Sequence, residues 1–460
     1  MYIPPLSLVC KLEYDQVKFS DPCASMIGMA SITAPAFESQ EFQSRAPIDL
    51  CCVIDKSGSM EGSKLELVKT SLLFMVDQMK PHDRICIVEF DSDVNTCLPL
   101  TQMDKIGKTK AHHAIGSIKA GSCTNISGAL LEAFDIMSQR TQIATISSIL
   151  LFTDGLPTKG IMSQEKLVQM IEKCIQKSSC SLFTFGFGEE HSSNCLVALS
   201  QSGGGLYYYI KKEDEIPQAF SDCLGGLLTV FAQNITLKIR CTGDNGVILK
   251  GVILNQGGYK QQVIDPNKEI HVKLGDIYAE EQRDILFEMQ LPMLRSPIEK
   301  QELVTVTLEY FNVEKADKEF LVCETFVSRS EQTKNSTIEN NSSLTLIDMQ
   351  RNRIAAANAL QQARNYADNN GLENARNLLG NVIGQIQTSP SNRETFCQAL
   401  IRDLRECLEE MTSNDRYQQV GSKVVNAMWC ANVQQRSNIS SRTFETKSKK
   451  IAKAKVVSFK

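Results

Sequence analysis

Between Ile48 and Thr229, continuous apolar runs alternate with segments in which apolar residues recur every three or four positions. The runs have the length of buried strands, and the periodic segments between them have the length of helices. The apolar runs are IDLCCVID (48–55), RICIVEF (84–90), SSILLFTD (147–154) and SLFTFGFG (181–188). Strands that alternate with helices in this way predict a doubly wound, mostly parallel sheet covered by helices.

Oxygen-bearing side chains follow three of the predicted strands or open the helices after them. They are Asp55, Ser57, Ser59, Thr124 and Asp154. Each of them alone is ordinary in a turn or as a helix N-cap. Together they fall at the carboxyl edge of the sheet, where doubly wound folds bind ligands, and their oxygens suit a small hard cation. The sequence therefore predicts a metal site assembled from three loops.

The ordered pattern D-x-S-x-S, then T-N, then T-D-G resembles the metal-ion-dependent adhesion site of the von Willebrand factor type A (vWA) family. The resemblance covers residues 46–230 and implies a Rossmann-like domain. It assigns Asp55, Ser57, Ser59, Thr124 and Asp154 as ligands of Mg²⁺, or sometimes Mn²⁺. In the family, a Glu or Asp carboxylate from a protein partner typically completes the coordination of the ion.

Short apolar runs separated by turn residues lie on both sides of this unit and predict an antiparallel β-sandwich into which the vWA domain is inserted. Several intracellular vWA proteins, including vesicle-coat subunits, are similar in building a β-domain from both sides. The predicted order is N-terminal sandwich strands (1–45), vWA domain (46–230), the remaining sandwich (231–330), a linker (331–342), a small α-helical region (343–435) and a basic flexible tail (436–460).

Composition narrows the setting of the chain. A net charge of -4 gives no general attraction to nucleic acid, and no run of eighteen apolar residues predicts a membrane span. The sixteen cysteines are irregularly spaced, without a C-x-x-C pair or a Cys/His cluster. The irregular cysteine spacing favours reduced thiols. Together with an N-terminus that lacks a basic, apolar leader, it predicts a cytoplasmic, non-secreted protein.

Three functions are compatible with these features. We expect an intracellular Mg²⁺-dependent interaction or scaffold protein that binds an acidic group of a partner. The alternative is a structural subunit of a larger coat- or ubiquitin-pathway-associated assembly, in which the metal only stabilises the loops. A metal-dependent hydrolase is disfavoured, because no general base or nucleophile stands out beside the five ligands. Without a Cys/His cluster, ubiquitin ligase activity is not carried over, and we expect no enzyme.

Other conspicuous residues have simpler explanations. Adjacent residues on a helix point in different directions, so His112 and His113 are predicted to lie at the surface rather than to share an ion. Asp91 and Asp93 are predicted hairpin-turn residues. The run Tyr207–Tyr209 is predicted to form an edge strand with alternating exposure.

Overall fold

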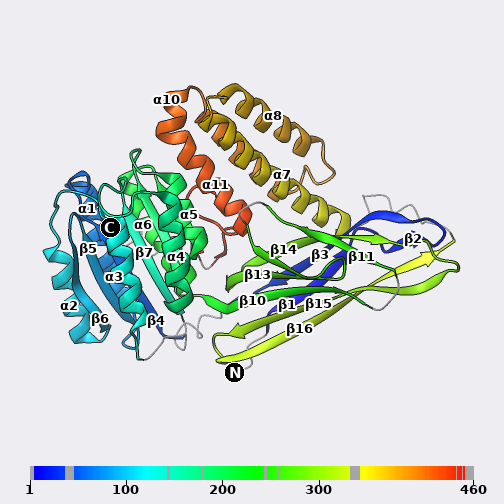
Figure 1. Ribbon diagram of the computed structural model, residues 1–460, viewed down its shortest axis with the longest axis horizontal. Coiled ribbons are helices and arrows are strands. Elements are labelled where there is room, and N and C mark those ends of the chain that lie inside the picture. Colours follow the sequence, from blue (N-terminus) through cyan, green and yellow to red (C-terminus); the bar gives the residue numbers. More distant parts are fainter. Residues whose placement is uncertain are drawn as a thin grey trace. The chain divides into compact units, whose positions relative to one another are not determined.

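The computed structural model describes residues 5–36, 46–141, 146–178, 180–242, 246–255, 258–331, 342–441, 443–447 and 449–450. The chain forms two compact units. Unit 1 comprises Met1–Glu38, Val230–Glu409 and Asn432–Arg436, and unit 2 comprises Ser39–Thr229, Glu410–Ala431 and Ser437–Lys460. Figure 1 labels many of the elements of both units.

Unit 2 contains a six-stranded sheet of order β6-β5-β4-β7-β8-β9. Its strands are β4 (Ile48–Asp55), β5 (Arg84–Phe90), β6 (Val94–Gln102), β7 (Ile146–Thr153), β8 (Ser181–Phe187) and β9 (Gly204–Ile210). Only β6 pairs antiparallel to its neighbour; the other pairs are parallel. Every residue of the central strands β4 and β7 is buried, which is why both are continuous apolar runs. The predicted α/β fold is confirmed.

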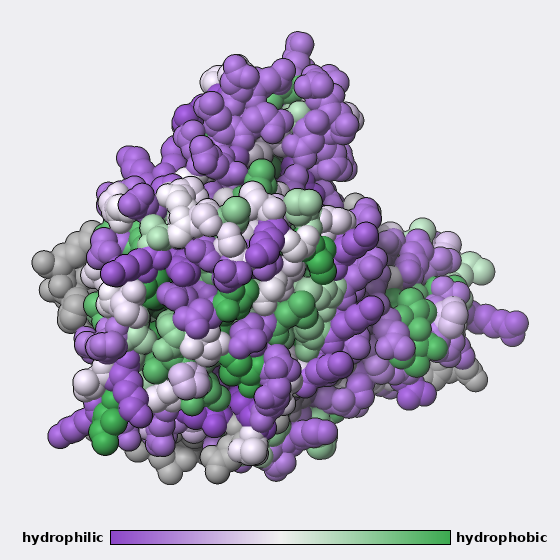
Figure 2. Space-filling view, turned by 60° about the vertical axis from the view of Figure 1, so that its left-hand side comes forward, coloured by the Kyte–Doolittle hydropathy of each residue, from purple (hydrophilic) through white to green (hydrophobic). Residues whose placement is uncertain are grey.

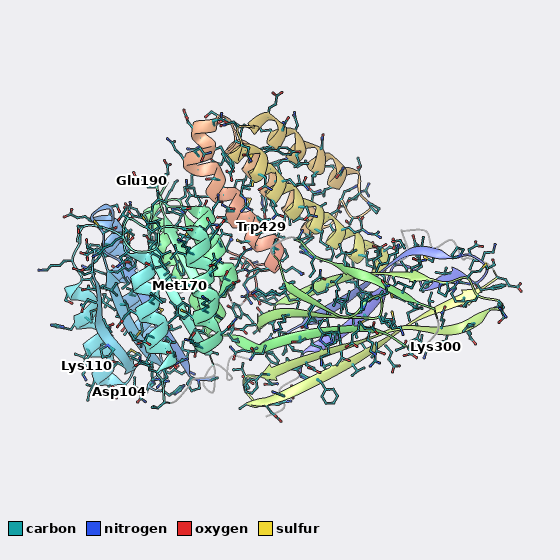
Figure 3. All side chains as sticks on the ribbon, viewed as in Figure 1. Asp104, Lys110, Met170, Glu190, Lys300 and Trp429 are labelled. Atoms are coloured by element: carbon teal, nitrogen blue, oxygen red, sulfur yellow. The ribbon has the colours of Figure 1, made fainter. Side chains whose placement is uncertain are left out.

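Six helices connect and cover these strands. They are α1 (Ser63–Gln78), α2 (Lys105–Ser117), α3 (Ile126–Ser138), α4 (Gln164–Ser178), α5 (Ser193–Ser202) and α6 (Ile216–Leu227). Helix α1 packs against α2 and α6, and helix α4 packs against α3 and α5. Asp104, labelled in Figure 3, begins α2 by accepting a hydrogen bond from the Gly107 N–H at 2.8 Å.

The prediction of alternating exposure in the Tyr207–Tyr209 run is wrong. β9 is an edge strand, but all three tyrosines are buried. Side chains of successive strand residues point to opposite faces, and both faces are covered here. The Tyr208 hydroxyl bonds Asp222 of α6, while the rings of Tyr207 and Tyr209 lie against His191.

Unit 1 contains two sheets, of order β1-β3-β14-β11 and β12-β13-β10-β15-β16-β2. Their strands are β1 (Ser7–Leu12), β2 (Gln16–Lys18), β3 (Cys23–Thr33), β10 (Val230–Cys241), β11 (Ile248–Ile253), β12 (Lys260–Asp265), β13 (Glu269–Tyr278), β14 (Gln282–Leu291), β15 (Ile298–Asn312) and β16 (Asp317–Ser330). Residues of both sheets form one apolar core. β3 precedes the sheet of unit 2 in the sequence and pairs antiparallel with β14, which follows that sheet. This pairing is what an inserted domain requires.

The helical region is present but belongs to both units. Helices α7 (Ser342–Asp368), α8 (Leu372–Thr388) and α9 (Thr395–Glu409) lie in unit 1. α10 (Asn414–Arg416), the π-helical turn Tyr417–Gly421 and most of α11 (Ser422–Gln434) belong to unit 2. None of the helices in the described part of the chain has the length and apolar character needed to cross a bilayer.

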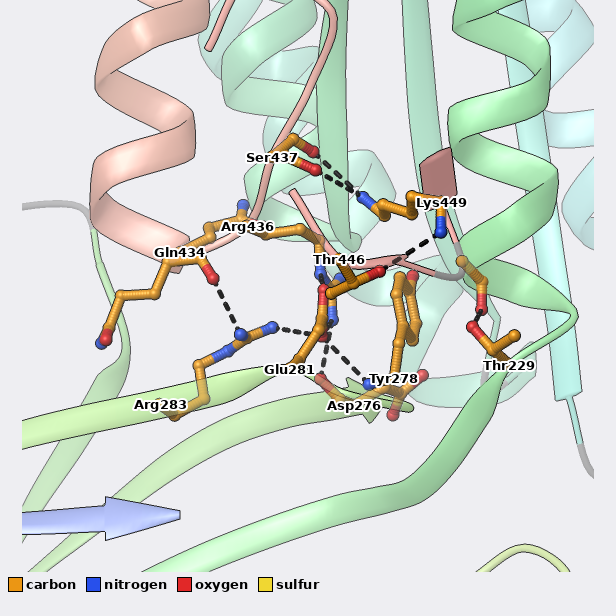
Figure 4. A network of polar contacts seen from close by, with 12 residues as sticks. Thr229, Asp276, Tyr278, Glu281, Arg283, Gln434, Arg436, Ser437, Thr446 and Lys449 are labelled. Atoms are coloured by element: carbon orange, nitrogen blue, oxygen red, sulfur yellow. Dashed lines mark hydrogen bonds and ion pairs between the residues drawn. The ribbon is translucent and has the colours of Figure 1, made fainter. Parts of the chain in front are cut away.

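The expected flexible tail differs most from the structure. Ser437, Asn438, Ser441 and Lys449 are buried, and Lys449 pairs with Asp222 of α6 at 3.1 Å. Figure 4 shows the Lys449 ammonium donating to the backbone and side-chain oxygens of Ser437. This part of the tail is therefore fixed to unit 2. Residues 451–460 and most of the predicted linker lie outside the described residues.

Candidate metal centre

Asp55 is the last residue of the central strand β4 and is fully buried. Its carboxylate accepts hydrogen bonds from the Ser57 N–H at 2.8 Å and from the Thr153 hydroxyl at 2.5 Å. Burial raises the pKa of the Asp55 carboxyl to about 6. The two hydrogen bonds fix the orientation of the carboxylate at the carboxyl edge of the sheet.

The turn after β4 reaches the turn after β7 through Ser59. The Ser59 hydroxyl donates to Asp154 Oδ1 at 2.6 Å, which joins residues 95 positions apart. The Ser57 hydroxyl lies 3.2 Å from the Ser59 hydroxyl. Asp154 is 2% exposed, so its carboxylate depends on these neighbours rather than on solvent.

The loop that carries Thr124 is bonded to both of these turns. The Gly58 N–H donates to the Ser122 backbone oxygen at 3.2 Å, and the Gly121 N–H donates to the Lys56 backbone oxygen at 2.6 Å. In the turn after β7, the Thr158 N–H donates to the Thr124 backbone oxygen at 2.9 Å. A Cβ placed on Gly155 would lie 3.4 Å from the Thr124 hydroxyl oxygen, so this hydroxyl is beside the Asp154 turn.

The structure thus brings together all three loops predicted from the sequence. It also adds a residue that the sequence argument missed. Lys64, the second residue of α1, donates to Asp154 Oδ2 at 2.6 Å and to the Ser59 backbone oxygen at 3.2 Å. A signal was present, because the first turn of a helix disfavours positive charge. A lysine at that position is stabilised by a nearby anion.

The donor set fits a small hard cation. It offers two carboxylates and three hydroxyls, and a positive group, the Lys64 ammonium, already contacts Asp154. Among the described residues, no three His, Cys, Asp or Glu side chains gather in a way that suits a metal ion. A metal at this site therefore depends on the serine and threonine oxygens as well as on the two aspartates.

The other conspicuous residues lie where the sequence predicted. His112 and His113 are exposed, and His112 contacts Asp77 at 3.0 Å. The Asp91 N–H donates to the Asp93 backbone oxygen at 3.0 Å, as in a turn. The described residues include all sixteen cysteines, and no disulfide forms among them.

Two family models match parts of this chain. Residues 49–222 match the model of the von Willebrand factor type A domain, and residues 346–453 match that of the CPSF6-like, RSLD domain, N-terminal region. The central unit of the chain is therefore similar to a vWA domain and has its fold.

Two solved structures share the fold of nearly the whole chain. A von Willebrand factor type A protein from Catenulispora acidiphila covers 92% of this chain and 96% of its own, with TM-score 0.67 and 15% identity. The ArnB paralog VWA2 from Sulfolobus acidocaldarius covers 93% of this chain and 98% of its own, with TM-score 0.58 and 18% identity. At these identities the likeness concerns the fold alone.

Curated relatives are similar over part of the chain. E3 ubiquitin-protein ligase WAV3 of Arabidopsis thaliana is 29% identical over 252 residues, which is 54% of this chain and 31% of the relative. Inter-alpha-trypsin inhibitor heavy chain H4 of Bos taurus is 32% identical over 180 residues, or 37% of this chain and 19% of the relative. The chain thus spans less than a third of the length of either relative.

Proposed function

We propose that this protein is an intracellular, Mg²⁺- or Mn²⁺-dependent interaction module that binds an acidic side chain of a protein partner. The observation that carries the proposal is the hydrogen bond from Ser59 to Asp154, which joins two of the three ligand loops. In this proposal Asp55 and Asp154 supply carboxylates to the ion, and Ser57, Ser59 and Thr124 supply hydroxyls.

The charge of the site favours an acidic partner. Two carboxylates only neutralise a divalent cation, and five protein donors leave one position of an octahedron open. When bound, the ion supplies a Lewis-acidic centre that attracts a further carboxylate. On the face shown in Figure 2, hydrophobic areas are interspersed with hydrophilic side chains.

The same arrangement favours binding over catalysis. The Asp55 carboxylate accepts two hydrogen bonds, and the Asp154 carboxylate is held by Ser59 and Lys64. Hydrolysis needs a further base or nucleophile placed beside the ion. We therefore propose a scaffold rather than an enzyme. The ligase named among the relatives shares only 31% of its length with this chain.

Asp154→Ala tests the proposal in the full-length protein. After EDTA treatment, calorimetry with Mg²⁺ or Mn²⁺ should find one site per chain in the wild type and none in the variant. Asp93→Ala is the matched control, because Asp93 belongs to a neighbouring loop and its side chain is 92% exposed. Equal binding by Asp154→Ala and wild type contradicts the assignment, provided that circular dichroism shows both to be folded.

A second measurement separates a binding site from a structural metal. Peptides that carry one Glu, and matched peptides with Gln at that position, should differ in affinity only when the divalent ion is present. If EDTA lowers the melting temperature but binding of neither peptide depends on the ion, the metal is structural.

A further inference from the structure

Lys64 occupies an unusual position for a cation. It is the second residue of α1, where the unpaired backbone N–H groups give the helix end a partial positive charge. A lysine there is disfavoured by the helix itself. Its position therefore favours contact with an anion in the folded protein.

That interaction is with the candidate metal site. The ammonium lies 2.6 Å from Asp154 Oδ2 and 3.2 Å from the Ser59 backbone oxygen. The other oxygen of Asp154 accepts from the Ser59 hydroxyl at 2.6 Å. The first distance is short for an ammonium–carboxylate contact, as in charge-assisted hydrogen bonds. The ammonium thus bridges two loops that a metal ion would also bridge.

We propose that Lys64 is a built-in cation that holds the site together in the metal-free protein and leaves Asp154 when a divalent ion binds. The inference rests on the proposed metal-dependent function. A divalent ion and an ammonium repel each other strongly when both contact one carboxylate. The side chain of Lys64 is 29% exposed, so its flexible stem can carry the ammonium into solvent.

Lys64 would then set the affinity of the site for metal. Each binding event has to displace the ammonium from Asp154, so the lysine lowers the affinity while it keeps the loops in place. Such a site binds the metal only above a threshold concentration of the free ion. Below that concentration, Lys64 keeps the ligand loops in place.

Lys64→Met in the full-length protein tests the inference. Methionine keeps much of the apolar stem and removes the charge. Calorimetry after EDTA treatment should show Mg²⁺ and Mn²⁺ binding about tenfold more tightly than wild type. The melting temperature in EDTA should fall, and its rise on adding metal should be larger. Lys69→Met is the matched control, because Lys69 lies on the same helix and pairs with Glu66 at 2.8 Å.

The outcomes separate this inference from the proposed function. If the wild type binds metal and Lys64→Met binds no more tightly, or Lys69→Met gains equally, the inference is overturned and the function stands. If only Lys64→Met binds, the function proposed for the wild type is wrong, while competition by Lys64 is supported. If neither binds, both are overturned.

Discussion

Two of the lysine–aspartate ion pairs in unit 2 differ in burial. Lys64 pairs with Asp154 at 2.6 Å, and its side chain is 29% exposed. Lys449 pairs with Asp222 at 3.1 Å, and its side chain is 2% exposed. Asp222 also accepts a hydrogen bond from Tyr208, and Lys449 donates two to Ser437. An exposed ammonium can exchange its partner for water, whereas a buried one cannot leave without stranding a charge.

The comparison separates an exchangeable contact from a structural one. Lys64 lies at the carboxyl edge of the sheet, where a ligand could replace it. Lys449 fastens the C-terminal segment to α6 inside the folded unit. The same two residue types thus form an exchangeable contact in one place and a structural ion pair in the other. The difference between them is the access of water to the lysine side chain.

The largest expected effect follows from breaking the buried pair. Lys449→Met leaves the Asp222 carboxylate buried without its ammonium, which should cost about 3–5 kcal/mol of stability. Urea unfolding of the vWA unit should show the loss. Lys450→Met, at an exposed neighbour, is the control and should change little. Asp222→Asn combined with Lys449→Met should recover part of the stability. Equal midpoints for Lys449→Met and Lys450→Met would show that the pair is not structural.

His191 extends the comparison to a buried base with neutral partners. It contacts the Tyr207 hydroxyl at 2.7 Å and the Phe187 backbone oxygen at 3.3 Å. Burial, and then the charge of Lys423, lower the pKa of His191 to about 3. On acidification, the folded protein therefore binds this proton at a lower pH than the unfolded chain, whose histidine has a pKa of about 6.5. The contribution of His191 to the free energy of unfolding is therefore fully present above pH 6.5. It decreases as the pH is lowered, and the loss reaches about 3 kcal/mol at pH 4.

Denaturant unfolding of wild type and His191→Gln between pH 4 and 8 checks this expectation. The wild type should lose stability more steeply on acidification, so that the gap between the two proteins narrows. Parallel curves would show that the protonation of His191 is not linked to folding.

The smallest effect concerns a neutral member of the candidate site. Thr124→Ala removes one hydroxyl and one methyl group of a buried side chain beside the Asp154 turn, so the fold should be kept with a small loss of stability. Metal affinity should fall about three- to tenfold, because one uncharged oxygen donor is lost. Partner affinity should fall further, since the position of the ion sets the open coordination site. Thr109→Ala, at an exposed residue of α2, is the control. Partner binding that matches wild type would favour a structural metal.

Much of unit 2 could be predicted because its strands and helices are specified by sequence patterns over short stretches of the chain. The strands 48–55 and 84–90 were predicted with the bounds observed, since buried strands form continuous apolar runs. The grouping of Asp55 and Asp154 also follows from topology, because the parallel strands β4 and β7 end at the same edge of the sheet. Their role as ligands stays a proposal.

The errors share a physical cause. The Tyr207–Tyr209 run was judged by its place at the edge of the sheet, whereas its burial depends on His191 and on α6, elsewhere in the chain. The tail was judged by its charge, but Lys449 is neutralised by Asp222, 227 positions away. Charge in the sequence predicts exposure only when no distant partner compensates it.

The sequence by itself determined the strands and helices of the central unit, the mostly parallel direction of its strands and the oxygen-rich loops at the edge of the sheet. Each of these depends on periodicity and residue type over short stretches. Only the tertiary structure decided which charges meet, that Lys64 contacts Asp154 and that Lys449 is buried against Asp222. Ion pairs between distant residues leave no periodic pattern, because their energy depends on separation in space and on access to water.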